Sequence, residues 1–405
     1  MSGTRARQRI LVAMSGGVDS SVAAAMLVEA GHELIGATMK TFCYSDDEVA
    51  TGARTCCGLD GIQDARRVAD RLGIAHYVFD VEREFTRDVI DDFVSEYSRG
   101  RTPNPCVRCN SNTKFRDLFR RGRVLGCDGV ASGHYVRLDR DGGEPRLLRG
   151  LDSGKDQSYF LWGLPSGLLD RLHFPLGELS KVEVRSRARE MGLVTADKPE
   201  SQEICFVPTG NYRDFLARKL LPVHPALLPG AIVDHEGGVL GRHDGYSGFT
   251  VGQRKGIGGG RPEPCYVLEI RPESREVVVG PRHLLEVGGV VVGDLNWLTA
   301  TPPPGTQLHV QIRYRSPLVA CRIDSYGDDS MRLSFDEPAS AVTPGQSSVL
   351  FHGDRVLGGG RIRQVTTSTR TTRRTPASVP AALRSESREP PPSPRRTGRP
   401  AVLRG

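Results

Sequence analysis

The chain has 405 residues, nine cysteines and a formal net charge of +7. No stretch is long and apolar enough to span a membrane, and the polar residues 1–9 do not resemble a signal peptide. We therefore expect no membrane partner and a cytoplasmic protein whose cysteines are reduced. The net charge excludes little, because residues 366–405 carry nine arginines against Glu386 and Glu389 and leave residues 1–365 neutral overall. Any nucleic-acid interface must be a local patch.

The first predicted element is a buried strand over Ile10–Met14, which ends at the small-residue loop Ser15-Gly16-Gly17-Val18-Asp19-Ser20-Ser21. A helix is expected to follow over residues 22–30. The backbone N–H groups of such a loop and of the helix N-terminus can bind an anion. Because the loop contains no lysine, it differs from the Walker-type phosphate loop. It resembles the pyrophosphate loop of enzymes that split ATP into AMP and pyrophosphate; the alternative is a plain glycine-rich turn.

The next elements alternate between strands and helices. Strands are predicted over Leu34–Met39, Ala75–Val81 and Gly129–Val136. Helices are predicted over Ile62–Leu72, over the apolar face Phe85, Val89, Phe93, Val94 and Tyr97, and after a capping box of Ser180 and Glu183. This alternation predicts a doubly wound parallel sheet with ligands at the carboxyl ends of its strands. The Ser15 loop and the turn Ser132-Gly133-His134 both lie at such ends.

Two cysteine contexts stand out. Cys106 and Cys109 form a Cys-x-x-Cys pair in a proline-rich loop with arginines on both sides, and cationic neighbours favour the thiolate. Half of a zinc site is the alternative, although no second ligand pair follows. By itself, Cys205 is most simply a small buried residue. The remaining cysteines are expected to be incidental or to pack in cores: Cys43, Cys56, Cys57, Cys127, Cys265 and Cys321.

Beyond about Phe206, short strands replace the helices. The glycine-rich basic segment Gly248–Gly258 either follows a phosphate backbone or forms a surface turn. In residues 309–316, Val310, Ile312 and Tyr314 are predicted on one face and Gln311, Arg313 and Arg315 on the other. Such strands predict a small β-barrel. We expect a catalytic domain over 1–205, a central mixed/β domain over 206–285, a barrel over 286–365 and a disordered basic tail over 366–405.

Six motifs in order resemble those of the tRNA-specific 2-thiouridylase family, which thiolates the wobble uridine of tRNA. They are the Ser15–Ser20 loop and the segments 104–110, 132–135, 155–158, 201–206 and 252–256. The resemblance extends from about Ile10 to about Ile362. It implies a pyrophosphate-loop domain of the adenine nucleotide alpha hydrolase type, followed by the central domain and the barrel.

The resemblance also implies roles for individual residues. It makes Cys109 the catalytic nucleophile and Cys205 the carrier of a persulfide. The implied ATP pocket consists of Ala13, Met14, Ser15, Gly16, Gly17, Val18, Asp19, Ser20, Met39 and Gly133. The implied contacts with tRNA or its target base are Asn104, Pro105, Cys106, His134, Lys155, Asp156, Gln157, Arg313, Tyr314 and Gln346.

The chemistry explains why such an enzyme would need both ATP and thiols. A uracil carbonyl oxygen is a very poor leaving group until an adenylyl group from ATP converts it into AMP. Mg²⁺ is expected to offset phosphate charge, with Asp19 orienting it. A persulfide, loaded by an upstream sulfur-donor protein, can then supply sulfur, and a second thiol can cleave the S–S bond and leave a disulfide.

Position 106 departs from a common form of the family motif, which has aspartate where this chain has Cys106. One interpretation is a further thiol in the relay. The other is a [4Fe–4S] cluster held by Cys106, Cys109 and Cys205, with sulfide on the open iron. Two other functions remain open from the sequence. One is a small-molecule ligase that adenylates its substrate for attack by an amine, and the other is a non-catalytic RNA-binding protein with a decayed nucleotide site.

Overall fold

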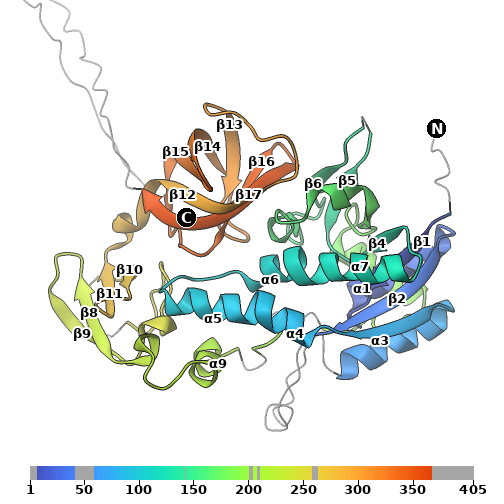
Figure 1. Cartoon of the computed structure of the whole chain (residues 1–405), viewed down its shortest axis with the longest axis horizontal. Helices are drawn as coiled ribbons and strands as arrows, with labels where there is room; N and C mark the ends of the chain where they lie inside the picture. Colours follow the sequence, from blue (N-terminus) through green and yellow to red (C-terminus); the bar gives the residue numbers. More distant parts are fainter. Residues whose placement is uncertain are drawn as a thin grey trace, which may run out of the picture. The chain divides into compact units, whose positions relative to one another are not determined.

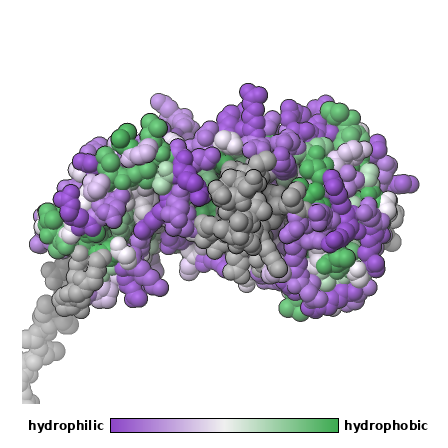
Figure 2. Space-filling view, turned by 90° about the horizontal axis from the view of Figure 1, so that it is seen from below, coloured by the Kyte–Doolittle hydropathy of each residue, from purple (hydrophilic) through white to green (hydrophobic). Residues whose placement is uncertain are grey.

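The computed structural model describes residues 7–41, 59–141, 143–199, 204–207, 210–257 and 263–366, all within one compact unit. The predictions for Cys43, Cys56, Cys57 and the tail lie outside the described residues. Among the described helices, none combines the length and the apolar character needed to cross a bilayer. On the face shown in Figure 2, hydrophilic residues predominate and hydrophobic residues form smaller separate groups.

The N-terminal part is built on a five-stranded parallel sheet in the order β3-β2-β1-β4-β7 (Figure 1). Its strands are β1 (Arg9–Ala13), β2 (Glu33–Lys40), β3 (Ala75–Asp80), β4 (Gly129–Ala131) and β7 (Leu172–His173). Every pairing is parallel, and the central β1 reads Ile10-Leu11-Val12 with no exposed surface. Such a continuous apolar run is typical of a strand covered on both faces. The predicted doubly wound parallel sheet is confirmed.

Alternate residues of β1 contribute to two different cores. Ile10 and Val12 pack in the core that includes residues of α1 (Val18–Glu29), α3 (Leu59–Leu72) and α8 (Lys181–Glu190). Leu11 packs with residues of α7 (Phe115–Val124) on the opposite face. The capping box of Ser180 and Glu183 at the start of α8 is confirmed. The helices therefore cover both faces of the sheet and leave the carboxyl ends of its strands for ligands.

Two predicted boundaries were wrong. The helix expected from residue 22 begins at Val18, so Asp19 and Ser20 lie in its first turn. The small residues of the loop hid this start, because Gly17 is the N-cap without providing a side-chain cap. The strand predicted over Gly129–Val136 is two strands: β4 ends at Ala131, and β5 (Val136–Asp139) pairs in a different sheet with β6 (Arg146–Arg149). The chain leaves the parallel sheet in the turn between them, which lines the site described below.

Two helical segments contain a π-helical stretch. The first consists of α4 (Glu82–Phe85), η1 (Thr86–Ile90) and α5 (Asp91–Ser98). The second consists of α6 (Pro105–Arg108), η2 (Cys109–Lys114) and α7. The predicted apolar face of the first segment is confirmed, since Phe85, Val89, Phe93 and Tyr97 are all buried. π-Helical turns are rare and frequently lie at functional sites.

A small sheet in the order β10-β11-β8-β9 forms the central part of the chain. Its strands are β8 (Gly230–Asp234), β9 (Val239–His243), β10 (Tyr266–Arg271) and β11 (Glu276–Gly280), and α9 (Tyr212–Lys219) precedes them. Short 3₁₀ turns connect this and other parts of the chain: η3 (Ser158–Phe160), η4 (Ser166–Arg171), η5 (Pro225–Leu227), η6 (Tyr246–Gly248) and η7 (Arg282–Leu285).

The C-terminal part is a closed β-barrel, as predicted. Its strands follow the order β12-β15-β14-β13-β16-β17, and β17 pairs back with β12 to close the sheet. They are β12 (Glu286–Trp297), β13 (Gln307–Gln311), β14 (Val319–Gly327), β15 (Ser330–Ser340), β16 (Ser347–His352) and β17 (Arg355–Thr366). The β5–β6 hairpin joins the outside of β17 through one bridge between Leu148 and Arg355. Closure leaves no edge strand between β12 and β17.

The predicted alternation over residues 309–316 holds only in part. Val310 and Ile312 are buried as expected, but β13 ends at Gln311. Gln311 was predicted on the solvent face and is instead buried, where its side-chain amide donates to the carbonyl of Ser316 at 3.1 Å. That bond stabilises a turn in which Arg315 has a positive φ of 63°. A period of two could not reveal the turn, because alternation reports only which face a side chain occupies and not where the strand ends.

Candidate active site

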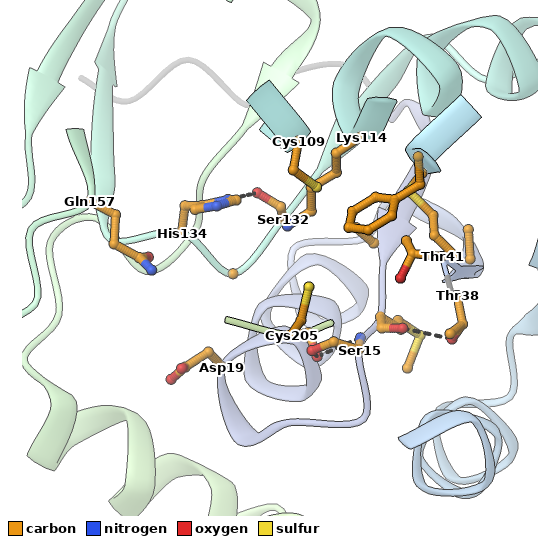
Figure 3. A pocket seen from close by; sticks show the side chains of 17 residues that line it. Ser15, Asp19, Thr38, Thr41, Cys109, Lys114, Ser132, His134, Gln157 and Cys205 are labelled. Atoms are coloured by element: carbon orange, nitrogen blue, oxygen red, sulfur yellow. Dashed lines mark hydrogen bonds between the residues drawn. The ribbon is translucent and has the colours of Figure 1, made fainter. Parts of the chain in front are cut away.

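A cavity of about 260 Å³ lies at the carboxyl ends of the parallel strands (Figure 3). It brings together the loop after β1, the end of β2, the turn after β4, the helical segment η2 and the segment around Cys205. The residues that line it are Ala13, Met14, Ser15, Asp19, Ser20, Ala37, Thr38, Met39, Thr41, Phe85, Cys109, Lys114, Ser132, Gly133, His134, Gln157 and Cys205. Most residues of the predicted ATP pocket are therefore in one place, together with both predicted catalytic cysteines.

The loop after β1 is held in shape by its own hydroxyl groups. The backbone N–H of Ser15 donates to the Ser20 hydroxyl at 3.2 Å, and that hydroxyl lies 3.1 Å from the carbonyl of Gly17, to which it donates. Gly16 has a φ of +71°, and a Cβ at this position would overlap the carbonyl of Gly61. Only glycine suits this position, because an L side chain would be both strained and blocked. The ordered loop leads directly into the N-terminus of α1.

Two lysines distant in sequence complete the surroundings of the loop. Lys181, at the start of α8, donates to Asp19 Oδ1 at 2.6 Å, and the hydroxyl of Tyr135 donates to the same oxygen at 2.7 Å. Lys198 donates to the carbonyl of Gly16 at 2.9 Å and pairs with Asp64 at 2.6 Å. Sequence reasoning missed both lysines; the capping box placed Lys181 at a helix start but gave no sign of what lies beside it.

Cys109 and Cys205 both line the cavity, although they are far apart in the sequence. Cys109 opens η2, and Cys205 lies in the described segment 204–207. Both pack, half-buried, against the aromatic core that contains Phe85, Phe93 and Phe206. This core fixes the two cysteine-bearing segments against each other. The arrangement places two thiols and a phosphate-type loop around one small volume.

His134 forms a neutral wall of the cavity. Its Nδ1 lies 2.8 Å from the Ser132 hydroxyl, and its ring packs against those of Phe115 and Phe174. Burial, together with the nearby charge of Lys114, holds the pKa of His134 well below its usual value. The imidazole is therefore uncharged at neutral pH and can act as a hydrogen-bonding group rather than as a cation.

The comparisons with known proteins agree with this geometry. Residues 8–209 match the model of a "tRNA methyl transferase HUP domain", residues 213–281 a "tRNA methyl transferase PRC-barrel domain" and residues 287–362 an "aminomethyltransferase beta-barrel domain". A relative from Geobacter metallireducens, named tRNA-specific 2-thiouridylase MnmA, is 51% identical over 361 residues, which cover 88% of this chain and 97% of the relative. A relative of the same name from Carboxydothermus hydrogenoformans is 46% identical, with coverages of 88% and 98%. The chain belongs to the tRNA-specific 2-thiouridylase family.

Two solved structures that resemble this chain do so at low sequence identity and low TM-score. A 4-thiouridine synthetase–RNA complex with bound ATP is 14% identical with a TM-score of 0.33, covering 52% of this chain and 50% of that one. An NMN synthetase from Francisella tularensis has a TM-score of 0.31 and 16% identity, with coverages of 49% and 67%.

The loop before Cys109 is held by the barrel. The side-chain amide of Gln346 donates to the carbonyls of Thr102 and Pro103 at 2.8 and 3.3 Å. The backbone N–H of Thr102 also donates to the carbonyl of Pro344 at 2.9 Å. Asn104 is the N-cap position of α6, and Pro105 is its buried first residue. Gln346, a predicted tRNA contact of the family, thus positions the loop that leads into the helical segments of Cys106 and Cys109.

The other predicted tRNA contacts occupy varied environments, and their roles stay predictions. Asp156 is buried and accepts hydrogen bonds from Arg149 Nε and the N–H of Gly150 at 2.8 and 3.0 Å. Gln157 accepts from the N–H of Tyr135 at 3.0 Å and lines the cavity. Lys155 is half-buried, and Arg313 is exposed in the turn after β13. Next to Arg313, the ring of Tyr314 lies 4.4 Å from that of Phe160.

The three cysteines predicted as alternative cluster ligands do not form a ligand set. Cys106 is exposed and does not line the cavity that contains Cys109 and Cys205. Within the described part of the chain, no three His, Cys, Asp or Glu side chains are grouped so that they could hold a metal ion. These residues therefore do not fit a [4Fe–4S] cluster. Mg²⁺ is a different case, because it is commonly held by one or two carboxylates together with substrate phosphates, and Asp19 offers one carboxylate here.

Proposed function

We propose that this protein uses ATP to replace the C2 oxygen of the wobble uridine of tRNA with sulfur. The supporting observation is that Cys109 and Cys205 line the same cavity as the Ser15–Ser20 loop. This chain covers 97% and 98% of the lengths of the two relatives described above, and both are named tRNA-specific 2-thiouridylases. The family models carry methyl-transferase descriptions instead, but methyl transfer requires neither a pyrophosphate-type loop nor two thiols in one cavity.

In the first step, the C2 oxygen of uridine attacks the α-phosphorus of ATP and pyrophosphate leaves. The N–H groups of the loop and of the α1 N-terminus hold the β- and γ-phosphates. Asp19 is positioned by Lys181 and Tyr135 to hold Mg²⁺, which would offset the phosphate charge. The wobble base must leave its stack to reach a cavity of this size.

In the second step, a persulfide on Cys205 attacks C2 through its outer sulfur, and AMP departs with the former C2 oxygen. The thiolate of Cys109 then attacks the inner sulfur and breaks the S–S bond. The products are 2-thiouridine and a Cys109–Cys205 disulfide, which cellular thiols reduce before the next turnover. A separate sulfur-donor protein must reload the Cys205 persulfide, and both requirements suit a reducing cytoplasm.

The test is nucleoside mass spectrometry of tRNA after incubation with ATP and a persulfide donor. Cys109→Ser and Cys205→Ser should each abolish 2-thiouridine while ATP binding is retained. Cys265→Ser is the matched control, because Cys265 is also half-buried but packs in the central domain. Normal thiolation by either cavity variant would refute the relay.

Two further results would identify another function. Anaerobically purified protein should contain no stoichiometric iron, and a Cys106→Ser variant should retain thiolation. Stoichiometric iron that is lost in this variant would favour the cluster. Amine-dependent AMP release without tRNA would instead favour a small-molecule ligase.

A further inference from the structure

The π-helical segment η2 begins at Cys109 and ends at Lys114, and both residues line the cavity. Five residues make about 1.4 turns of an α-helix, so two side chains with this spacing would point in different directions. A π-helix bonds residue i to i+5, as the N–H of Phe115 does to the carbonyl of Asn110. The wider turn therefore presents Lys114 and Cys109 to the same volume, as Figure 3 shows.

Lys114 brings a positive charge that other described residues do not neutralise. Within the described lining of the cavity it is the one lysine or arginine, and Asp19 is the one carboxylate. The charge of Asp19 is already compensated by Lys181 at 2.6 Å. Lys114 forms no ion pair with another residue in the described ranges, and its ammonium lies 6.0 Å from the centre of the Phe115 ring. Its charge reaches His134 across the cavity, where it helps to lower the pKa of that imidazole.

The position of the Lys114 ammonium relative to the loop indicates which phosphate group it can bind. The loop and the α1 N-terminus provide N–H groups for the terminal phosphates, whereas the persulfide on Cys205 must reach the carbon under attack and Cys109 must reach the inner sulfur of that persulfide. The α-phosphorus is bonded, through the transferred oxygen, to that carbon. It therefore has to lie between the loop and the thiols. Lys114, which shares η2 with Cys109, is the cation on the Cys109 side of this position (Figure 3).

We propose that Lys114 binds the α-phosphoryl group of ATP and retains the phosphate of AMP as it leaves. This inference rests on the proposed adenylation. During the first step the bond from the C2 oxygen to phosphorus forms and the bond to pyrophosphate breaks. During the second step the C2–O bond breaks, and its electron pair remains on the AMP phosphate. The ammonium of Lys114 stabilises negative charge in both steps and transfers no proton.

The experiment compares Lys114→Met, Lys114→Arg and Lys219→Met in the full chain. Lys219 is the matched control, because its ammonium lies 5.9 Å from the Phe215 ring, on α9 away from the cavity. The measurements are single-turnover pyrophosphate release with tRNA, and AMP binding by calorimetry. We expect Lys114→Met to slow pyrophosphate release about 100-fold. It should also bind AMP at least tenfold more weakly, whereas Lys114→Arg recovers most of both and Lys219→Met matches the wild type.

Unchanged AMP affinity in Lys114→Met would overturn the inference, as would an arginine variant as defective as the methionine variant. AMP binding is read without tRNA, so this result is independent of thiolation. If the wild type binds AMP through Lys114 but forms no 2-thiouridine, the proposed function fails and the inference about the phosphate contact survives. Lys114→Gln is the second variant if Lys114→Met does not fold, judged by its melting temperature, and it carries the same expectations.

Discussion

Gly133 shows how closely the cavity is packed around the nucleotide loop. A Cβ at this position would lie 2.7 Å from the backbone carbon of Asp19 and 2.8 Å from the N of Ser20. These are backbone atoms of the first turn of α1, which cannot move aside as a flexible side chain would. The turn after β4 can therefore approach α1 only because residue 133 has no side chain.

We expect Gly133→Ala to lower ATP-dependent turnover about 100-fold, because the added methyl group displaces either the turn or the loop by several tenths of an ångström or more. The measurement is pyrophosphate release at saturating tRNA. Gly167→Ala is the control, since a Cβ there meets no atom within 4 Å. If Gly133→Ala retained full turnover, the close approach of these two segments would not matter for catalysis.

Position 106 is the residue at which the sequence allowed two chemistries. The tertiary structure leaves Cys106 exposed, while Cys109, three residues later, lines the cavity. Cys106 belongs to α6, whereas Cys109 begins the π-helical η2. The proposed persulfide relay uses only the two thiols that line the cavity.

At the scale of elements, the catalytic loop depends on a contact with the barrel. Gln346 follows a turn that precedes β16, and its amide holds the carbonyls of Thr102 and Pro103. Two such hydrogen bonds contribute about 1 kcal/mol each. Their loss would loosen the loop before Cys109 without removing a group from the cavity.

We expect Gln346→Ala to reduce the thiolation kcat about tenfold, while the KM for tRNA changes less than twofold. The reason is that the variant affects loop position rather than a tRNA contact. Steady-state thiolation over a range of tRNA concentrations separates the two parameters. The control is Gln364→Ala, at an exposed position of β17. A large rise in KM with an unchanged kcat would show that Gln346 contacts the tRNA instead.

At the scale of the whole described unit, buried charges connect the barrel to the catalytic domain. Arg361 of β17 lies 2.8 Å from Asp92 and 3.2 Å from Glu96, both on α5. Burial alone would lower the pKa of Arg361, but these carboxylates outweigh it and the net pKa is raised. Asp92 also lies 3.6 Å from Arg108, the residue before Cys109. One carboxylate thus links the barrel to Arg108, directly before the π-helical segment η2.

The composition of the C-terminal tail predicts that it is dispensable. The described barrel shows after which residue the chain can be truncated without shortening a strand. Val365 and Thr366 still pair with Val290 and Gly289 of β12, so removal after Gln364 would shorten a barrel strand. A chain ending at Ser368 should thiolate tRNA within about twofold of the full-length rate at physiological salt, because arginine-rich attraction to RNA is screened there. The measurement is initial thiolation rate at low and physiological salt, and a tenfold loss at physiological salt would contradict the prediction.

The sequence by itself determined the parallel sheet, the loop at its centre, the barrel and the family. These features depend on local signals: an apolar run such as Ile10–Met14, a glycine pattern, alternation of residues along strands and motifs in a constant order. Sequence alone also nominated Cys109, from its Cys-x-x-Cys pair between arginines, whereas Cys205 was nominated only through the resemblance.

Only the tertiary structure decided which charges and thiols meet. Lys181 and Lys198 reach the loop from distant segments, and no periodicity predicts such contacts. The turn of η2 brings Lys114 beside Cys109, although the apolar pattern cannot distinguish a π-helix from an α-helix. The physical reason is that side-chain direction and long-range packing depend on all the segments around one cavity, whereas a sequence pattern reports on one segment at a time.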